Sequence, residues 1–127
     1  DIYDSSLTWA AAAGGLVAST EDIIKWVQAL FIGNAVLDET QQIKLMTLVS
    51  TQTGEPINKV TATHPNGFGL GVTAKYNPDH PLESMWFYEG STLGFRALYI
   101  YVPCNQVIVA TAFNSTTNTE NDHAHQV

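Results

Sequence analysis

The first third of the chain carries its apolar residues at helical spacing. Gly14-Gly15 interrupts an alanine-rich stretch that would otherwise favour a helix, and Ser19 or Thr20 then offers a side-chain oxygen typical of an N-cap. The apolar residues that follow recur every three to four positions, which predicts an amphipathic helix that ends at Gly33-Asn34. They are Ile23, Val27, Leu30 and Phe31, with Ile24 and Trp26 widening the apolar face.

A second, shorter helix is expected to follow. Asp38 or Thr40 can cap its first turn, and its apolar content is Ile43, Leu45, Met46, Leu48 and Val49. Residues 50–66 are mainly polar and contain Gly54, Pro56 and Pro65, which predicts a loop between the helical half and the rest of the chain.

From Gly67 the apolar period changes to two. The stretch "GFGLGVTAKY" predicts a strand with a glycine face, on which another part of the protein must pack closely. Three further strands are predicted for "SMWFYEG", "GFRALYIYV" and "QVIVATAF", and "PCNQ" is short enough to join the last two as a hairpin. Because those two strands are apolar on both faces, we expect helices above and below the sheet.

The order of helices followed by strands predicts the α+β class, with an antiparallel β-sheet flanked by helices. We expect residues 1–127 to form a single unit, because neither half buries its apolar surface alone, and residues 115–127 to form a polar tail.

The formal net charge is -7, and the five basic residues are scattered. Nucleic acid and anionic membranes are therefore poor partners for this chain. No apolar run approaches the ~20 residues of a membrane span.

Five short segments, taken in order, carry a family resemblance. "AAGGLVASTEDIIKWVQALF", "LDETQQIKLM", "GFGLGV", "YEGSTLGF" and "VIVATAFNST" together resemble the C-terminal part of the serine β-lactamase-like family. That family includes class C β-lactamases, D-alanyl-D-alanine carboxypeptidases (both penicillin-recognising) and related esterases. The resemblance implies acyl transfer through a serine, a small-molecule or peptide substrate, no cofactor or metal, and a periplasmic or extracellular location.

Tyr88-Glu89-Gly90 stands where the family carries a Lys-x-Gly or His-x-Gly on an edge strand. By that resemblance, Gly90 lets substrate lie against the strand, and the backbone N–H of Ser91 donates to the oxyanion. Tyr88 departs from the pattern because it brings no positive charge at pH 7. Glu89 adds an acid that repels a substrate carboxylate, so the sequence favours a neutral ester or amide, or lost activity, over a peptide with a free C-terminus.

Two other family motifs are absent from this sequence. No serine is followed three residues later by lysine, and neither Tyr-x-Asn nor Ser-x-Asn occurs. We therefore expect a C-terminal fragment that is inactive alone and lacks an N-terminal part that holds the nucleophile. A non-catalytic binding or structural module of the same fold is the alternative. A fragment of this kind is expected to pair with its missing part or with a second copy of itself.

Several single residues remain open to two interpretations. Arg96 either forms an ion pair with Glu89 or Glu83, or binds a substrate carboxylate. Asn114 follows the last predicted strand and either faces substrate or caps a turn. The three tryptophans (Trp9, Trp26 and Trp86) either stack on carbohydrate or are core residues, and core packing is expected because two of them lie in apolar patterns. His64 is expected to be an ordinary exposed histidine.

Overall fold

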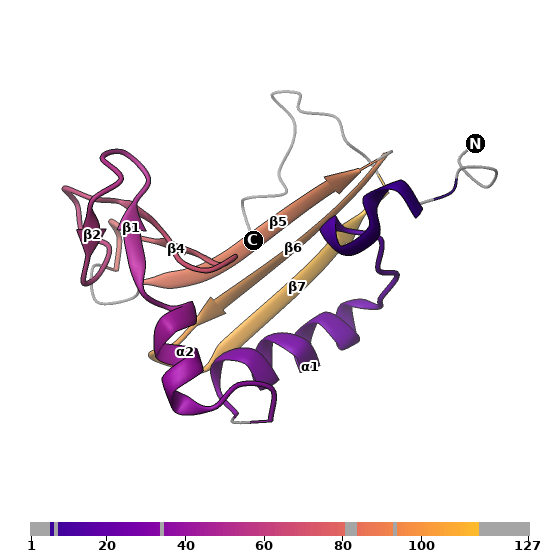
Figure 1. The fold of residues 1–127 in the computed structure, drawn as a ribbon, viewed down its shortest axis with the longest axis horizontal. Coiled ribbons are helices and arrows are strands. Elements are labelled where there is room, and N and C mark those ends of the chain that lie inside the picture. The colour runs from indigo at the N-terminus through magenta and orange to yellow at the C-terminus, as the bar shows by residue number, and fades with distance from the viewer. Residues whose placement is uncertain (1–5, 7, 34, 81–83, 93, 115–127) are drawn as a thin grey trace.

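The computed structural model of the protein describes residues 6, 8–33, 35–80, 84–92 and 94–114. A short 3₁₀ helix, η1 (Thr8–Ala13), comes first, followed by α1 (Thr20–Phe31) and α2 (Glu39–Leu45). Seven strands follow: β1 (Leu48–Ser50), β2 (Pro56–Ile57), β3 (Asn66–Phe68), β4 (Thr73–Lys75), β5 (Met85–Thr92), β6 (Phe95–Val102) and β7 (Val107–Phe113). The α+β class predicted from the sequence is confirmed (Figure 1). The predicted tail at 115–127 lies outside the described residues.

Both α-helices begin at the caps that the sequence offers. Ser19 accepts from the backbone N–H of Asp22, and Asp22 accepts in return from the N–H of Ser19. Asp38 and Gln41 form the same reciprocal arrangement before α2. Each capping box satisfies backbone donors that a helix start leaves without partners, which fixes the first turn.

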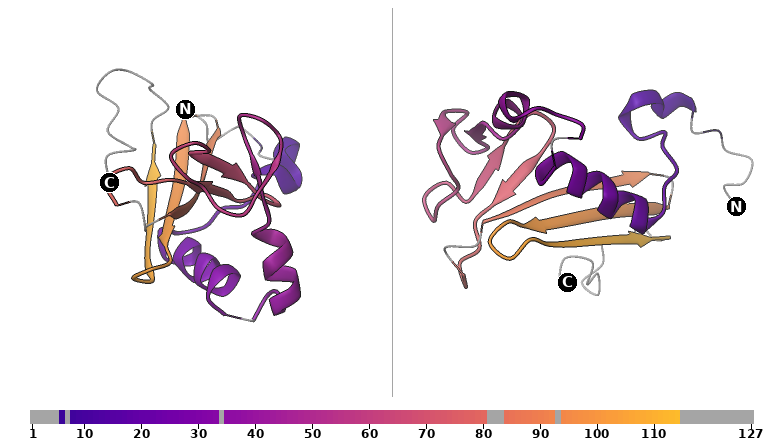
Figure 2. Two further views of the ribbon diagram at one scale, coloured as in Figure 1. Left: turned by 90° about the vertical axis from the view of Figure 1, so that its left-hand side faces the viewer. Right: turned by 90° about the horizontal axis from the view of Figure 1, so that it is seen from below.

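The seven strands form one antiparallel sheet in the order β2-β1-β3-β4-β5-β6-β7. The three long strands predicted from the sequence are confirmed as β5, β6 and β7, and the turn at "PCNQ" joins the last two. Helix α1 packs on β6 and β7. The described helices gather on one side of these strands, so the prediction of helices on both faces does not hold for the described part of the chain (Figure 2).

The structure corrects three predictions of local structure. Leu48 and Val49 belong to β1 rather than to the second helix, because α2 ends at Leu45. The segment "GFGLGVTAKY" forms two short strands, β3 and β4, that are joined by a turn at which Gly71 has a φ of 79°. The predicted loop at 50–66 contains β2 and the first residue of β3.

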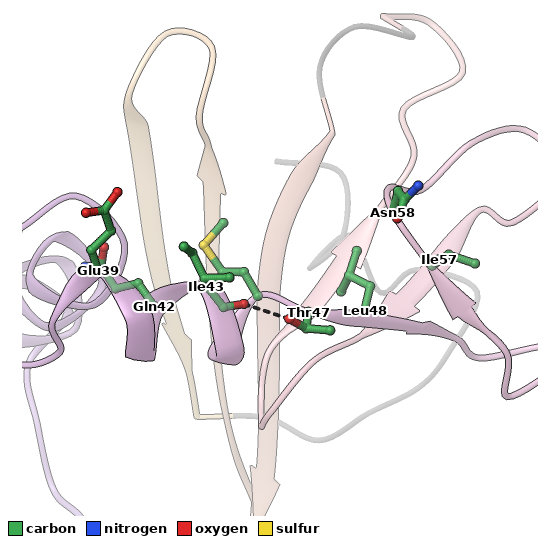
Figure 3. Close-up of a pocket in the computed structure, with 8 residues that line it drawn as sticks. Glu39, Gln42, Ile43, Thr47, Leu48, Ile57 and Asn58 are labelled. Atoms are coloured by element: carbon green, nitrogen blue, oxygen red, sulfur yellow. Dashed lines mark hydrogen bonds between the residues drawn. The ribbon is translucent and has the colours of Figure 1, made fainter.

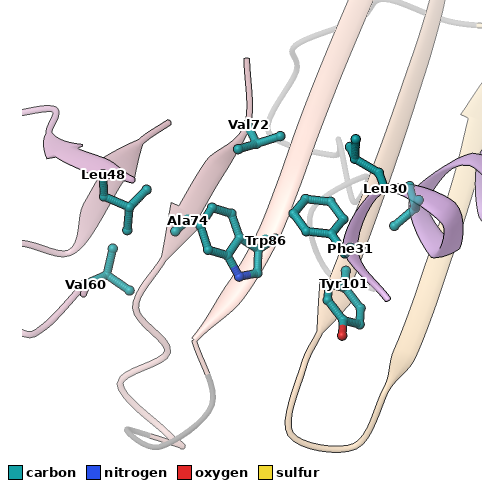
Figure 4. Close-up of a cluster of buried hydrophobic side chains, with 9 residues drawn as sticks. Leu30, Phe31, Leu48, Val60, Val72, Ala74, Trp86 and Tyr101 are labelled. Carbon is teal, nitrogen blue, oxygen red and sulfur yellow. The ribbon is translucent and has the colours of Figure 1, made fainter. Parts of the chain in front are cut away.

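The core extends across the sheet, from the short strands to α1 (Figure 4). At one end the ring of Phe31 lies 5.6 Å from that of Trp86 and 5.3 Å from that of Tyr101. At the other end, Leu48, Val60, Val72 and Ala74 are buried among the short strands. Trp86 stands between the two groups, because β5 pairs with β4 on one side and with β6 on the other.

Candidate substrate-binding site

The strand β5 has two different margins. On one side it pairs with β6 along its length from Trp86 to Thr92. On the other side β4 reaches only Met85, Trp86 and Phe87. Beyond Phe87 no described strand adjoins β5 on that side, so residues 88–92 form a free margin of the sheet.

The alternation of backbone hydrogen bonds decides which groups point to this margin. Two residues separate Thr92 from Phe95, and the pair that closes so short a loop exchanges backbone hydrogen bonds. The next pair, Ser91 with Arg96, is then a non-hydrogen-bonded pair, and its N–H and C=O groups point outward. The N–H of Ser91 therefore points away from β6, toward the free margin.

A groove of about 820 Å³ lies along this end of the sheet. One wall is the segment around η1, and the other is formed by the ends of β5, β6 and β7. Its most exposed apolar side chains are Leu16 (91% exposed), Val17 (89%) and Trp9 (66%), with Phe95 on the strand side. Thr92 contributes a buried hydroxyl that has no hydrogen-bond partner within the described residues.

Gly90 lines the groove, and no neighbouring atom prevents a side chain at this position. A Cβ atom at this position would meet no atom within 4 Å, and the φ of Gly90 is not in the left-handed region. The fold of the described residues therefore does not require glycine here. The position leaves space for another molecule to approach the strand.

A family model described as Beta-lactamase matches residues 2–126 of the chain. The chain belongs to the beta-lactamase family. No curated protein and no solved structure matches it. The match spans both the helical and the β half, in agreement with the family resemblance of the sequence.

In this beta-lactamase family chain, Arg96 and Glu89 lie on the sheet face opposite Gly90, although Arg96 also lines the groove. Arg96 is directly opposite Ser91 and Phe113 in the register, so these residues share a face, whereas Gly90, Ala97 and Ala112 share the other. The buried guanidinium stacks 5.5 Å from the centre of the Phe113 ring and lies 3.9 Å from a carboxylate oxygen of Glu89. Of the two partners considered for Arg96, Glu89 is the one observed, and Glu83 lies outside the described residues.

Tyr88 stands on the groove face beside Tyr99, its direct cross-strand neighbour. Tyr88 is about half exposed, at 45%. Burial, and secondly the proximity of Tyr88, raises the pKa of Tyr99 to about 12. Tyr99 therefore stays neutral at physiological pH.

The structure places the remaining predicted residues differently from one another. Asn114 is exposed at the end of β7 and lines the groove together with Gly90 and Ser91. Trp86 is buried as expected, but Trp9 and Trp26 are exposed, so the prediction that all three tryptophans are core residues is wrong. Trp9 lies in η1, whose backbone kinks at Ala11, and its ring borders the groove.

A serine–histidine contact occurs away from the groove. The Nδ1 atom of His64 lies 3.2 Å from the hydroxyl of Ser50, so His64 is half-buried rather than exposed as predicted. Ser50 is buried, with 1% of its surface exposed. A substrate cannot reach that hydroxyl in this conformation, so we assign the pair a structural role in joining β1 to the loop before β3.

A second hollow of about 420 Å³ lies between α2 and the short strands β1 and β2 (Figure 3). Its lining is mostly apolar, and Glu39 is its only ionisable residue. The Thr47 hydroxyl donates to the Ile43 carbonyl at 2.8 Å and closes the end of α2 there (Figure 3). These residues offer no nucleophile with an adjacent base.

Within the described residues, no three His, Cys, Asp or Glu side chains come together as metal ligands would. Among the same residues, no helix has the length and apolar character needed to cross a bilayer. The groove at the margin of β5, which brings together Gly90, Ser91 and Asn114, is the candidate substrate-binding site.

Proposed function

We propose that this chain supplies the substrate-binding strand of a serine hydrolase that works by acyl transfer. The nucleophilic serine and its lysine partner come, in this proposal, from polypeptide outside these 127 residues, since the sequence contains no Ser-x-x-Lys. Alone, the chain is then inactive. The observation that carries the proposal is the free margin of β5, with the outward N–H of Ser91 beside a groove.

The chemistry follows from the direction of this N–H. During acyl transfer the substrate carbonyl becomes an oxyanion, and a fixed N–H at the margin donates to the oxygen as its charge develops. Gly90 allows the substrate backbone to lie close to the strand, because no side chain intervenes.

The groove favours an uncharged ester or amide with an apolar group. Its lining is dominated by apolar side chains, and its only charged lining residue is Arg96, whose guanidinium is held on the opposite face by Phe113 and Glu89. A substrate carboxylate therefore finds only one cation among these lining residues, and that guanidinium already contacts Glu89 and Phe113. In this proposal, D-alanyl-D-alanine carboxypeptidase activity ranks below esterase or amidase activity.

A non-catalytic binding module is the second candidate. The observation that favours it is that Tyr88, beside Tyr99 on the next strand, brings no cationic side chain to the place where the family carries Lys or His. Such a module retains the groove but has no chemistry, so it binds apolar ligands without turning them over.

A fluorophosphonate probe separates these proposals. The 127-residue chain should show no labelling and no turnover of nitrocefin or p-nitrophenyl esters. The product of the complete reading frame should be labelled on a serine outside residues 1–127. Labelling of a serine within these residues contradicts the proposed source of the nucleophile. A complete reading frame without Ser-x-x-Lys decides for the binding module.

A matched pair of variants tests the role of the Ser91 N–H in the labelled, active enzyme. Ser91→Pro removes the outward donor but no bond to β6, and should lower kcat about 10²–10³-fold. Ser91→Ala keeps the N–H and should retain kcat within a few-fold. Equal activity of the two variants would rule out this N–H as the oxyanion donor.

A further inference from the structure

A buried arginine lies directly across from the proposed oxyanion donor. Arg96 on β6 is the cross-strand partner of Ser91 on β5 and of Phe113 on β7, and the three strands lie side by side (Figure 1). Arg96 is 7% exposed and is the only buried charged residue in the part of the chain that the structure describes. Because a buried charge is costly unless it is paired, the groups that compensate Arg96 indicate what it does at this end of the sheet.

Arg96 links the strands on either side of its own. Its guanidinium lies 5.5 Å from the centre of the Phe113 ring, and one of its nitrogens lies 3.9 Å from a carboxylate oxygen of Glu89. Glu89 is two residues before Ser91, so it lies diagonally across from Arg96, at a separation that long side chains span. A single side chain of β6 therefore connects β5 and β7 at this end of the sheet.

The end of β5 has little else to hold it. Beyond Phe87 it pairs with β6 alone among the described strands, and Gly90 has no side chain to pack. Glycine also gives the backbone more conformational freedom than other residues do. A donor for an oxyanion must keep its position to within about 0.5 Å, so this margin needs a restraint beyond its pairing with β6.

We propose that Arg96 is a positioning residue for the proposed oxyanion donor, the N–H of Ser91. Its contacts with Glu89 and Phe113 fix the margin of β5 and thereby the direction of that N–H. The inference rests on the proposed function, because it concerns the same donor. It also gives a reason for the acid at position 89. Since neighbouring residues of a strand point to opposite faces, Glu89 lies away from Gly90 and compensates the guanidinium instead of meeting the substrate.

Recognition of a substrate carboxylate is the competing role, because Arg96 also lines the groove. A carboxylate would have to replace Glu89 beside a guanidinium that is already buried, which favours the positioning role. The two roles differ in their kinetics. Loss of a positioning residue lowers kcat for every substrate, whereas loss of a carboxylate-binding residue raises KM for acidic substrates alone.

Three variants serve the test. Arg96→Met removes the guanidinium and keeps a long side chain against Phe113. The remaining Glu89 side chain is 30% exposed and stays hydrated, so this variant should fold. Glu89→Gln is the milder change, because it retains the shape of that side chain. Lys75→Met is the matched control, since Lys75 is an exposed strand residue that pairs with Met85 at the other end of β5.

Kinetics of the complete, fluorophosphonate-reactive enzyme separate the two roles. Arg96→Met should lower kcat for p-nitrophenyl esters about 10–10²-fold and leave KM within about twofold of the parent. Arg96→Lys, which keeps a charge near Glu89, should retain more of kcat than Arg96→Met does. Glu89→Gln should lower kcat by a smaller factor, and Lys75→Met should match the parent. A rise in KM for acidic esters with kcat retained assigns Arg96 to carboxylate recognition and overturns the proposal.

NMR relaxation of the 127-residue chain gives a readout that does not depend on activity. The order parameter of the Ser91 N–H should be ~0.85 in the parent, as in rigid backbone, and fall toward ~0.6 in Arg96→Met. That of Val109, in the middle of β7, should not change. A Ser91 N–H that stays rigid in the variant overturns the proposal. If the margin loosens but the fluorophosphonate labels no serine of the complete protein, the restraint by Arg96 is supported and the proposed hydrolase is refuted.

Discussion

Two glycines, Gly69 in the turn after β3 and Gly90 in β5, differ in what a side chain would meet. A Cβ at Gly69 would lie 2.3 Å from the backbone oxygen of Leu45, which also accepts from the N–H of Leu70, whereas a Cβ at Gly90 meets nothing. Gly69→Ala should therefore lower the free energy of unfolding by about 1–3 kcal/mol, as overpacking does. Gly90→Ala should stay within about 0.5 kcal/mol of the parent. Urea titrations of both variants measure the difference.

The same comparison separates two reasons for a glycine. If Gly90→Ala is as destabilising as Gly69→Ala, Gly90 serves the fold and its proposed role at the groove loses support. If only Gly69→Ala is destabilising, the close packing of Leu45 on this turn is the reason for glycine at 69.

The buried phenol of Tyr99 should make the stability of the fold depend on pH in the alkaline range. Burial raises its pKa from 10.0 to about 12, so the folded state holds the phenol proton more tightly than the unfolded state does. This contribution to stability is fully present below pH 10 and is lost as pH rises toward 12. Urea midpoints should fall over that interval, and Tyr99→Phe should reduce the fall without abolishing it, because burial also raises the pKa of Tyr101. Equal slopes for parent and variant would contradict this assignment.

At the scale of elements, the two capping boxes should differ in what their loss does to the molecule. Helix α1 carries Val27, Leu30 and Phe31 into the core, whereas α2 has no buried residue. Ser19→Ala should therefore lower the free energy of global unfolding by about 1 kcal/mol. Asp38→Ala should mainly increase amide exchange within α2, leaving the global transition nearly unchanged. Urea titration and hydrogen exchange distinguish global from local loss, and equal global losses would contradict the prediction.

The elements that the sequence predicts best are those with strong local signals. Ser19 and Asp38 each have a side chain three residues later that completes the cap, so both helix starts were predictable. The end of α2 was not, because Leu48 and Val49 continue the apolar content of the helix although they are strand residues. The turn between β3 and β4 was missed because its alternation of glycine with apolar residues is also that of a continuous strand.

At the scale of the whole molecule, one wall of the groove was predictable from a local sequence motif and the other was not. Gly90 and Ser91 lie on one short strand, so the motif "YEGSTLGF" was enough to select them. The other wall depends on Trp9, Leu16 and Val17, which are more than seventy positions earlier in the sequence. Trp9 lies in η1 and Leu16 and Val17 follow it, and the kink of η1 at Ala11 is a feature without a periodic signal. Alternation along β6 places Arg96 and Ala97 on opposite faces of the sheet. It does not say which of these faces α1 covers.

Trp86 connects the two groups of core residues, and its loss should therefore affect the whole chain. Its ring contacts Phe31 under α1, and its strand neighbour Ala74 belongs to the short-strand group. Trp86→Ala should cost about 3–5 kcal/mol, a large part of the ~5–15 kcal/mol that stabilises a typical domain. Near-ultraviolet circular dichroism and urea titration should show a loss of fixed aromatic packing in both groups. Trp86→Phe, which keeps an aromatic ring against Phe31, should lose less and retain a single transition. If Trp86→Ala costs under about 1 kcal/mol, or if it melts only one group, the two groups are independent and the chain does not unfold as one unit.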